Sequence, residues 1–157
     1  MKIILLTVNK TKDHNIKNLL NDYELRINHY IKFSTINISE NKNIKKLSPK
    51  EQKEKEGILI QKELQNGDLC ILLDEGGVLL NSNEFAEYLN KKYNANYKRI
   101  VFVIGGAYGF SKSIYLLKHQ KLSLSKMTFT HQMTRLFFCE QMYRAHTILK
   151  NEKYHHI

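Results

Sequence analysis

The sequence of 157 residues has one proline, two cysteines and no apolar run long enough to cross a membrane. A single proline argues against an extended disordered region. The apolar run at residues 3–8 is shorter than the core of a signal peptide, and a membrane-spanning helix needs about 18 apolar residues. Cys70 and Cys139 both lie in apolar segments, so we expect buried free thiols rather than a disulfide. These absences together predict a cytoplasmic protein with no membrane partner.

Acidic residues are also scarce. The 15 Asp and Glu residues oppose 25 Lys and Arg residues, which gives a formal net charge of +10. Such an excess favours a polyanionic partner but does not choose between nucleic acid and an anionic membrane. Residues 111–157 hold eight Lys and Arg against Glu140 and Glu152, so +6 of the charge lies there. We therefore expect the C-terminal part to contact nucleic acid. Residues 42–63 alternate Lys with Glu, which predicts a solvated helix face.

Hydrophobic periodicity predicts an alternation of strands and helices. We expect strands at residues 3–8, 33–38, 69–73 and 100–104. Helices are expected from Asp13 to about residue 30, from Ser48 and Pro49 to near Gly67, at residues 83–93, from Ser111, and from Thr130 to about residue 150. This order predicts an α/β fold, a single domain over residues 1–157 with a mostly parallel sheet and helices on both faces.

Two loops follow predicted strands at the edge where such sheets bind ligands. Residues 74–77 read Asp-Glu-Gly-Gly, and an acidic residue there can accept hydrogen bonds from a ribose or an ammonium group. Residues 105–109 read Gly-Gly-Ala-Tyr-Gly, and glycine lets the backbone approach a ligand closely. Neither GxGxxG nor GxxxxGK[ST] occurs, which disfavours a Rossmann dehydrogenase and a P-loop NTPase.

The C-terminal third contains two further candidate segments. Residues 122–131 read Leu-Ser-Leu-Ser-Lys-Met-Thr-Phe-Thr-His; as a loop, their amides could bind an adenine edge while apolar side chains cover its ring. His131 opens the last predicted helix, either as a structural cap or as a functional group. That helix is apolar almost all round, so we expect it in the domain centre or at a subunit interface. No spacing of Cys, His and carboxylates predicts a metal site.

Taken together, these motifs resemble one family. The order is Leu-Asp-x-x-Gly, Ile-Gly-Gly-x-x-Gly, Leu-Ser-Leu-Ser-x-Met-Thr-x-x-His-x-x-x-Arg, Glu-Gln-x-Tyr-Arg-Ala-His and a terminal Tyr-His. The chain resembles the bacterial ribosomal RNA large subunit methyltransferase H family of the SPOUT superfamily over its whole length. The resemblance implies a SPOUT fold with a C-terminal trefoil knot, an exception to the rule that chains avoid knots.

The resemblance also implies an enzyme that uses S-adenosylmethionine to methylate N3 of a pseudouridine in 23S rRNA within the ribosome. The family works as a homodimer in which a partner's tail completes the substrate site. By motif matching, the cofactor contacts are Leu73, Gly105, Leu124, Ser125, Lys126, Met127, Thr128 and Phe129. The matched substrate-side and catalytic candidates are Arg144, Tyr154, His155 and His131, with Arg135 as a further choice.

The chain departs from the family pattern at two places. Val78 stands where the first motif usually continues with Lys, and His156 stands where the tail usually ends in Arg. Neither change touches the predicted cofactor contacts, so we still expect an active enzyme. Two other functions remain open at this point. One is a non-catalytic RNA-binding protein on the same scaffold, and the other is a small-molecule enzyme on a flavodoxin-like sheet.

Overall fold

The computed structural model describes residues 1–38 and 46–155. One sheet of five strands runs through the chain, in the order β2-β1-β4-β3-β5, and its paired strands are parallel. The strands are β1 (Lys2–Val8), β2 (Phe33–Ile38), β3 (Leu69–Leu79), β4 (Arg99–Ile104) and β5 (Gln120–Ser123). The helices are α1 (His14–Asn28), α2 (Pro49–Glu63), α3 (Ser82–Tyr93), α4 (Lys112–Leu116) and α5 (His131–Leu149). The predicted α/β class is confirmed.

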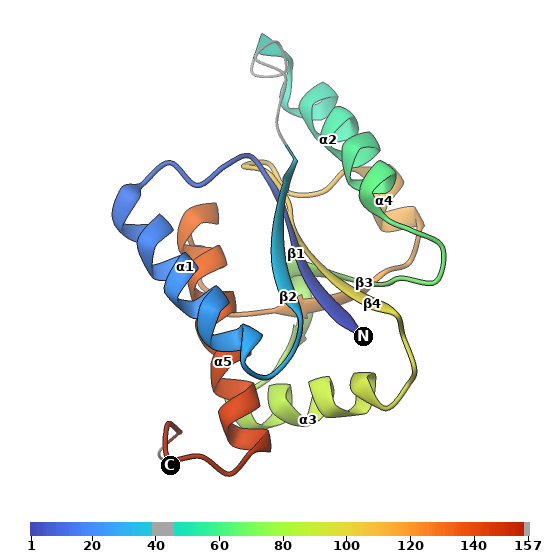
Figure 1. Ribbon diagram of the computed structural model, residues 1–157. Coiled ribbons are helices and arrows are strands. Elements are labelled where there is room, and N and C mark those ends of the chain that lie inside the picture. Colours follow the sequence, from blue (N-terminus) through green and yellow to red (C-terminus); the bar gives the residue numbers. More distant parts are fainter. Residues whose placement is uncertain (39–45, 156–157) are drawn as a thin grey trace.

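Helices cover both faces of the sheet because the central strands are apolar on both sides. One hydrophobic cluster joins alternate residues of β1 and β4 to α1, α3 and α5, with Phe102 and Phe138 at its centre. The other joins the intervening residues to α2 and α4 through Ile60 and Ile114. Figure 1 shows this layering, with α1, α3 and α5 on one side of the strands and α2 and α4 on the other.

Short polar side chains set where the helices begin. Asp13, Ser48 and Thr130 each accept a hydrogen bond from a backbone amide of the first turn. Ser48 and Glu51 form a complete capping box, with Pro49 at the first helical position. The predicted helix starts are therefore confirmed. The second helix ends earlier than expected, at Glu63, because the chain is already extended at Leu64.

The edge of the sheet beyond β3 differs from the prediction. The third strand does not stop at residue 73: it continues through the acidic glycine segment to Leu79, with a shift of register between Leu73 and Val78. A short fifth strand, β5, which is not among the four predicted strands, pairs with it. Gly77 allows this pairing, because a Cβ there would lie 2.5 Å from the backbone nitrogen of Leu122. A glycine pair that resembles a turn is here part of a bulged strand.

The Lys- and Glu-rich segment was predicted as a solvated face, and for part of α2 this is wrong. Residues 42–45 of that segment lie outside the described residues. Within α2, Gln52, Glu56, Gly57 and Ile60 are buried, and Glu56 is only 2% exposed. The reason is that one face of the helix packs against the sheet and against α4.

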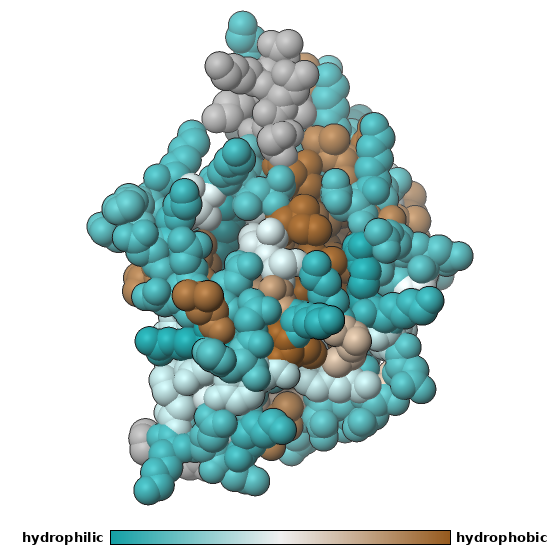
Figure 2. Space-filling model, viewed as in Figure 1, coloured by the Kyte–Doolittle hydropathy of each residue, from teal (hydrophilic) through white to brown (hydrophobic). Residues whose placement is uncertain are grey.

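The surface of the protein is mostly hydrophilic, in keeping with the many charged residues of the sequence. Hydrophilic side chains cover most of the face seen in Figure 2, and apolar ones form a strip over the edge strand β2 and beside α2. Within the described residues, no helix combines the length and hydropathy that a membrane crossing requires. Cys70 and Cys139 are free and buried, as expected.

Candidate functional site

A cavity of about 620 Å³ opens at the carboxyl edge of β3 and β4. This volume falls within the range of about 300–1,000 Å³ that is usual for small-molecule sites. Three segments form its walls: residues 73–75 in the middle of β3, the turn at residues 104–110, and the stretch from Ser123 to His131. Both loops that the sequence singled out, and the serine-rich segment, therefore meet around one space.

The glycine turn forms one wall of this cavity. The backbone amide of Gly109 donates to the carbonyl of Gly106 at 3.1 Å, which closes a tight turn directly after β4. Gly109 has a φ of +76°, a conformation that glycine adopts without strain. Gly105 precedes this turn, where an added Cβ would lie 3.3 Å from the Phe110 ring. At its three glycines the turn thus brings backbone without side chains to the cavity.

Asp74 forms an acidic corner of the cavity. Its Oδ1 accepts from the amide of Gly76 at 2.9 Å, and its Oδ2 accepts from the hydroxyl of Tyr115 at 2.5 Å. Burial, together with this carboxylate, raises the pKa of Tyr115 to about 12, so the phenol stays a donor at neutral pH. Tyr115 comes from α4 and was not predicted, because nothing in the sequence ties that short helix to β3.

The third wall is a compact loop. Ser123 Oγ donates to the carbonyl of Ser125 at 3.0 Å, and Ser125 Oγ accepts from the amide of Met127 at 2.9 Å. These two bonds hold the loop in a turn before α5. Its apolar members stay accessible: Met127 is 75% exposed and Phe129 is 37% exposed. Exposed apolar side chains beside a polar backbone suit a flat heteroaromatic ring that needs both.

The charge of the lining is opposite to that of the whole protein. Among the described residues, the lining of the cavity includes Asp74, Glu75 and His131 but no Lys or Arg. In a chain of net charge +10, this arrangement favours a cationic ligand. S-adenosylmethionine carries a sulfonium and an ammonium group on an adenosine. The acidic corner, the bare glycine backbone and the apolar loop therefore fit this cofactor.

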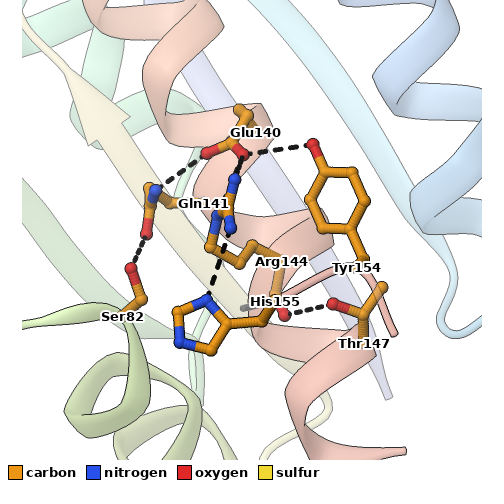
Figure 3. A network of polar contacts seen from close by, with 7 residues as sticks. All are labelled: Ser82, Glu140, Gln141, Arg144, Thr147, Tyr154 and His155. Atoms are coloured by element: carbon orange, nitrogen blue, oxygen red, sulfur yellow. Dashed lines mark hydrogen bonds and ion pairs between the residues drawn. The ribbon is translucent and has the colours of Figure 1, made fainter. Parts of the chain in front are cut away.

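A second group of predicted residues meets at the other end of α5, where Figure 3 shows them around Glu140. Arg144 Nε donates to Glu140 Oε1 at 3.0 Å, and the Tyr154 hydroxyl donates to the same oxygen at 3.2 Å. The Arg144 guanidinium also lies 4.8 Å from the centre of the Tyr154 ring. Glu140 was not predicted as a site residue, although its spacing of four residues from Arg144 is a helical pairing signal.

The protonation of this C-terminal cluster follows from its contacts. Burial raises the pKa of Tyr154, and neighbouring Tyr23 and Glu140 raise it further, so Tyr154 is a neutral donor. Arg144 Nη1 lies 3.3 Å from His155 Nδ1. A guanidinium can only donate, so in this contact His155 Nδ1 is the acceptor. Neither Tyr154 nor Nδ1 of His155 is then available to remove a proton.

The two groups of residues are far apart within one chain. Of the four matched substrate-side and catalytic candidates, only His131 lines the cavity. Arg144 lies 13 residues further along α5, which corresponds to about 20 Å of helix. Arg135 has a different place: it is 1% exposed and donates to the carbonyl of Val8 at 2.7 Å and to Thr11 at 2.9 Å. Arg135 therefore fastens α5 to the end of β1.

The structure brings together seven of the eight residues matched to the cofactor. Those on the cavity lining are Leu73, Gly105, Leu124, Ser125, Met127, Thr128 and Phe129. Lys126 belongs to the same loop but is not on the lining.

Val78, the first departure from the family pattern, is also off the lining and is 62% exposed. His156, the second departure, lies outside the described residues. Across residues 1–38 and 46–155, no cluster of three His, Cys, Asp or Glu suits a metal ion.

The fold and this cavity define an α/β protein with a small-molecule site at the carboxyl edge of its sheet. A family model described as "Predicted SPOUT methyltransferase" matches residues 1–155. Proteins named ribosomal RNA large subunit methyltransferase H are 53% identical in Parabacteroides distasonis and 51% identical in Christiangramia forsetii, over 99% of both chains in each case. The chain belongs to the SPOUT methyltransferases and, within them, to the ribosomal RNA large subunit methyltransferase H family.

A solved structure gives a more distant likeness. A proposed methyltransferase from Legionella pneumophila, in complex with the bound cofactor S-adenosylmethionine, has a TM-score of 0.46 and 10% identity, over 90% of this chain and 65% of that one. Family membership confirms the predicted enzyme class, a methyltransferase. The roles of individual residues remain predictions.

Proposed function

We propose that this protein transfers a methyl group from S-adenosylmethionine to N3 of a pseudouridine in 23S rRNA. The observation that carries the proposal is the acidic, glycine-walled cavity at the carboxyl edge of β3 and β4. Relatives that are more than half identical over nearly the whole chain and bear the name of a large-subunit methyltransferase support the RNA substrate. The excess of positive charge outside the cavity suits a phosphate backbone. A cytoplasmic location follows from a ribosomal substrate.

In this proposal the cofactor lies between the glycine turn and the loop before α5. The bare backbone at Gly105 and the amides of residues 124–129 hydrogen-bond the adenine edge, and Leu124 and Phe129 cover the ring. Asp74 accepts hydrogen bonds from a ribose hydroxyl or the ammonium group. Bound in this way, the cofactor supplies an electrophilic methyl group on its sulfonium. The trefoil knot that the family implies for this part of the chain stays a prediction.

The remaining work of the enzyme is to position the base and remove its imide proton. His131 is the candidate that the same chain presents to the cavity. Arg144 would stabilise negative charge on the base or a phosphate, because its guanidinium is held in one orientation by Glu140. Tyr154, as a neutral phenol, would donate to a carbonyl of the base once its single O–H turns from Glu140 to the substrate.

A homodimer accounts for the separation between these groups. Within one chain Arg144 lies about 15 Å along α5 beyond Thr134, which is on the cavity lining, and Tyr154 and His155 lie beside Arg144. A partner whose α5 packs against the cavity edge would bring its own cluster to the methyl group. Support comes from the apolar surface at that edge, where Phe129 and Phe137 are partly exposed with their ring centres 4.8 Å apart.

The proposed reaction is tested with tritiated S-adenosylmethionine and 70S ribosomes from a strain that lacks the modification. We expect label in 23S rRNA, and nucleoside analysis after digestion should identify 3-methylpseudouridine. Parallel reactions with isolated subunits and with naked 23S rRNA determine whether an assembled ribosome is required. Folded protein that binds the cofactor yet leaves every RNA unlabelled would contradict the proposal. Failure to bind the cofactor would instead favour a non-catalytic RNA-binding protein.

A further inference from the structure

Glu56 of α2 lies directly behind the glycine turn. It does not line the cofactor cavity, but its carboxylate lies against the backbone of Gly106, which does. A Cβ added to Gly106 would lie 2.6 Å from Glu56 Oε1 and closer still to Oε2. Any other residue at position 106 would therefore displace the carboxylate or the turn. Because Gly106 has no side chain, its backbone can contact the Glu56 carboxylate on one side and the cavity on the other.

The same helix contacts the far end of the turn. Gly57 packs against Ser111, where an added Cβ would lie 2.5 Å from the Ser111 hydroxyl oxygen. Ser111 is the N-cap of α4 and is 1% exposed. Two adjacent residues of α2 therefore contact the segment 106–111 at both of its ends. Figure 1 shows α2 and α4 side by side.

The carboxylate of Glu56 is itself held in place. Gln52, one helical turn earlier, donates from Nε2 to Glu56 Oε1 at 3.0 Å, and Gln52 is 8% exposed. Placing a carboxylate at 2% exposure costs free energy unless hydrogen bonds compensate. A hydrogen bond therefore holds the carboxylate at the place where it lies against Gly106.

We propose that Glu56 is a positioning residue that fixes the glycine turn in the shape that binds the methyl donor. Three of the five residues at 105–109 are glycine, so the free turn has many conformations to lose when a ligand binds. A buried carboxylate against Gly106 removes that freedom beforehand and so strengthens binding. This inference rests on the proposed function, because it assigns the turn to the cofactor.

The test is calorimetric binding of S-adenosylmethionine to the full chain carrying Glu56→Ala. The substitution removes the carboxylate that lies against Gly106. We expect the Kd to rise about tenfold because the turn loses its fixed shape. Turnover at saturating cofactor should stay near that of the wild type, since Glu56 contacts no reacting atom. The matched control is Glu63→Ala, the same change at an exposed position of the same helix.

A second variant separates positioning from folding. Gly106→Ala keeps the carboxylate but pushes it away, so it should weaken cofactor binding as well. The double variant should lose less affinity than the sum of the two single losses, because both disturb one contact. If Glu56→Ala does not fold, Gly106→Ala is measured alone, and unchanged affinity would then overturn the assignment.

Unchanged affinity in folded variants, or additive losses, would overturn the assignment. A wild-type protein that binds no cofactor would overturn the proposed function itself.

Discussion

Arg144 and Glu140 lie one turn apart on α5, and the guanidinium Nε donates to the carboxylate at 3.0 Å. This contact raises the pKa of Arg144 above its already high ordinary value, so the side chain is charged at every working pH. The same carboxylate oxygen accepts from Tyr154. One acid on α5 therefore orients two residues of the substrate-side cluster at once.

Arg144→Ala should lower turnover about a hundredfold or more, the size of effect that loss of a charge-stabilising donor has elsewhere. The Kd for S-adenosylmethionine should not change, because Arg144 does not line the cavity. Steady-state methylation and calorimetry measure the two quantities separately. Lys91→Ala, at an exposed position of α3, is the control. Full turnover with bound cofactor would remove Arg144 from the site.

Mixed dimers test whether the site is shared between subunits. A chain with Arg144→Ala and a chain with a blocked cavity, for example Gly105→Val, should each be nearly inactive alone. After random exchange of subunits, half of the dimers contain one chain of each kind. One of the two sites in such a dimer combines an intact cavity with an intact cluster, so about one site in four should be active. Methylation after mixing measures the recovery. A mixture as inactive as its parts would mean that each chain uses its own cluster.

The two cysteines should not react in the folded protein. Burial raises the pKa of Cys70 to about 12, and burial also raises the pKa of Cys139. The reactive thiolate is therefore nearly absent at pH 8. We expect no release of chromophore from a disulfide reagent under native conditions and two equivalents per chain in guanidinium chloride. Rapid native labelling of either thiol would contradict the buried placement.

His146 should make the protein less stable at mildly acidic pH. It lies between the rings of Tyr30 and Tyr93, and its Nδ1 donates to the carbonyl of Met142 at 2.8 Å. Burial lowers the pKa of His146 below its ordinary value of about 6.5. Because the folded state binds this proton more weakly, its contribution to stability is complete above about pH 6.5 and is lost as the pH falls through the folded-state pKa.

Chemical denaturation between pH 7.5 and 5 measures that loss. His146→Gln cannot take up a proton, so its free energy of unfolding should vary less over this interval than that of the wild type. The comparison uses the change of the unfolding free energy with pH. A loss of stability that is the same at every pH therefore does not affect it. Parallel slopes for the two proteins would show that other groups cause the acid sensitivity.

Much of the fold could be predicted from the sequence because its signals are local. Buried strands show as apolar runs, and the caps at Asp13, Ser48 and Thr130 show as short polar residues before helices. The bulge in β3 could not be predicted, since Gly76 and Gly77 resemble a turn until the backbone of Leu122 lies against them. The sequence of a strand does not show which other strand it pairs with.

The candidate site, too, could be predicted only in part from the sequence. Motif matching identified the cavity loops, yet it could not show that Arg144 is remote from them within one chain. Tyr115 and Glu56 were missed because each acts through a contact between distant segments. A Glu within a run of Lys and Glu looks solvated, and only its place against Gly106 distinguishes it. The roles of such residues can be identified from their tertiary contacts but not from their residue type.

The central claim is that one methyl donor lies between the glycine turn and the loop before α5. A crystal structure of the full-length protein grown with S-adenosylmethionine tests it most directly. The account predicts adenosine density against Gly105 and residues 124–129, with Asp74 at the polar end. Ordered cofactor at another edge of the sheet, or an empty cavity in protein that calorimetry shows to be saturated, would contradict it.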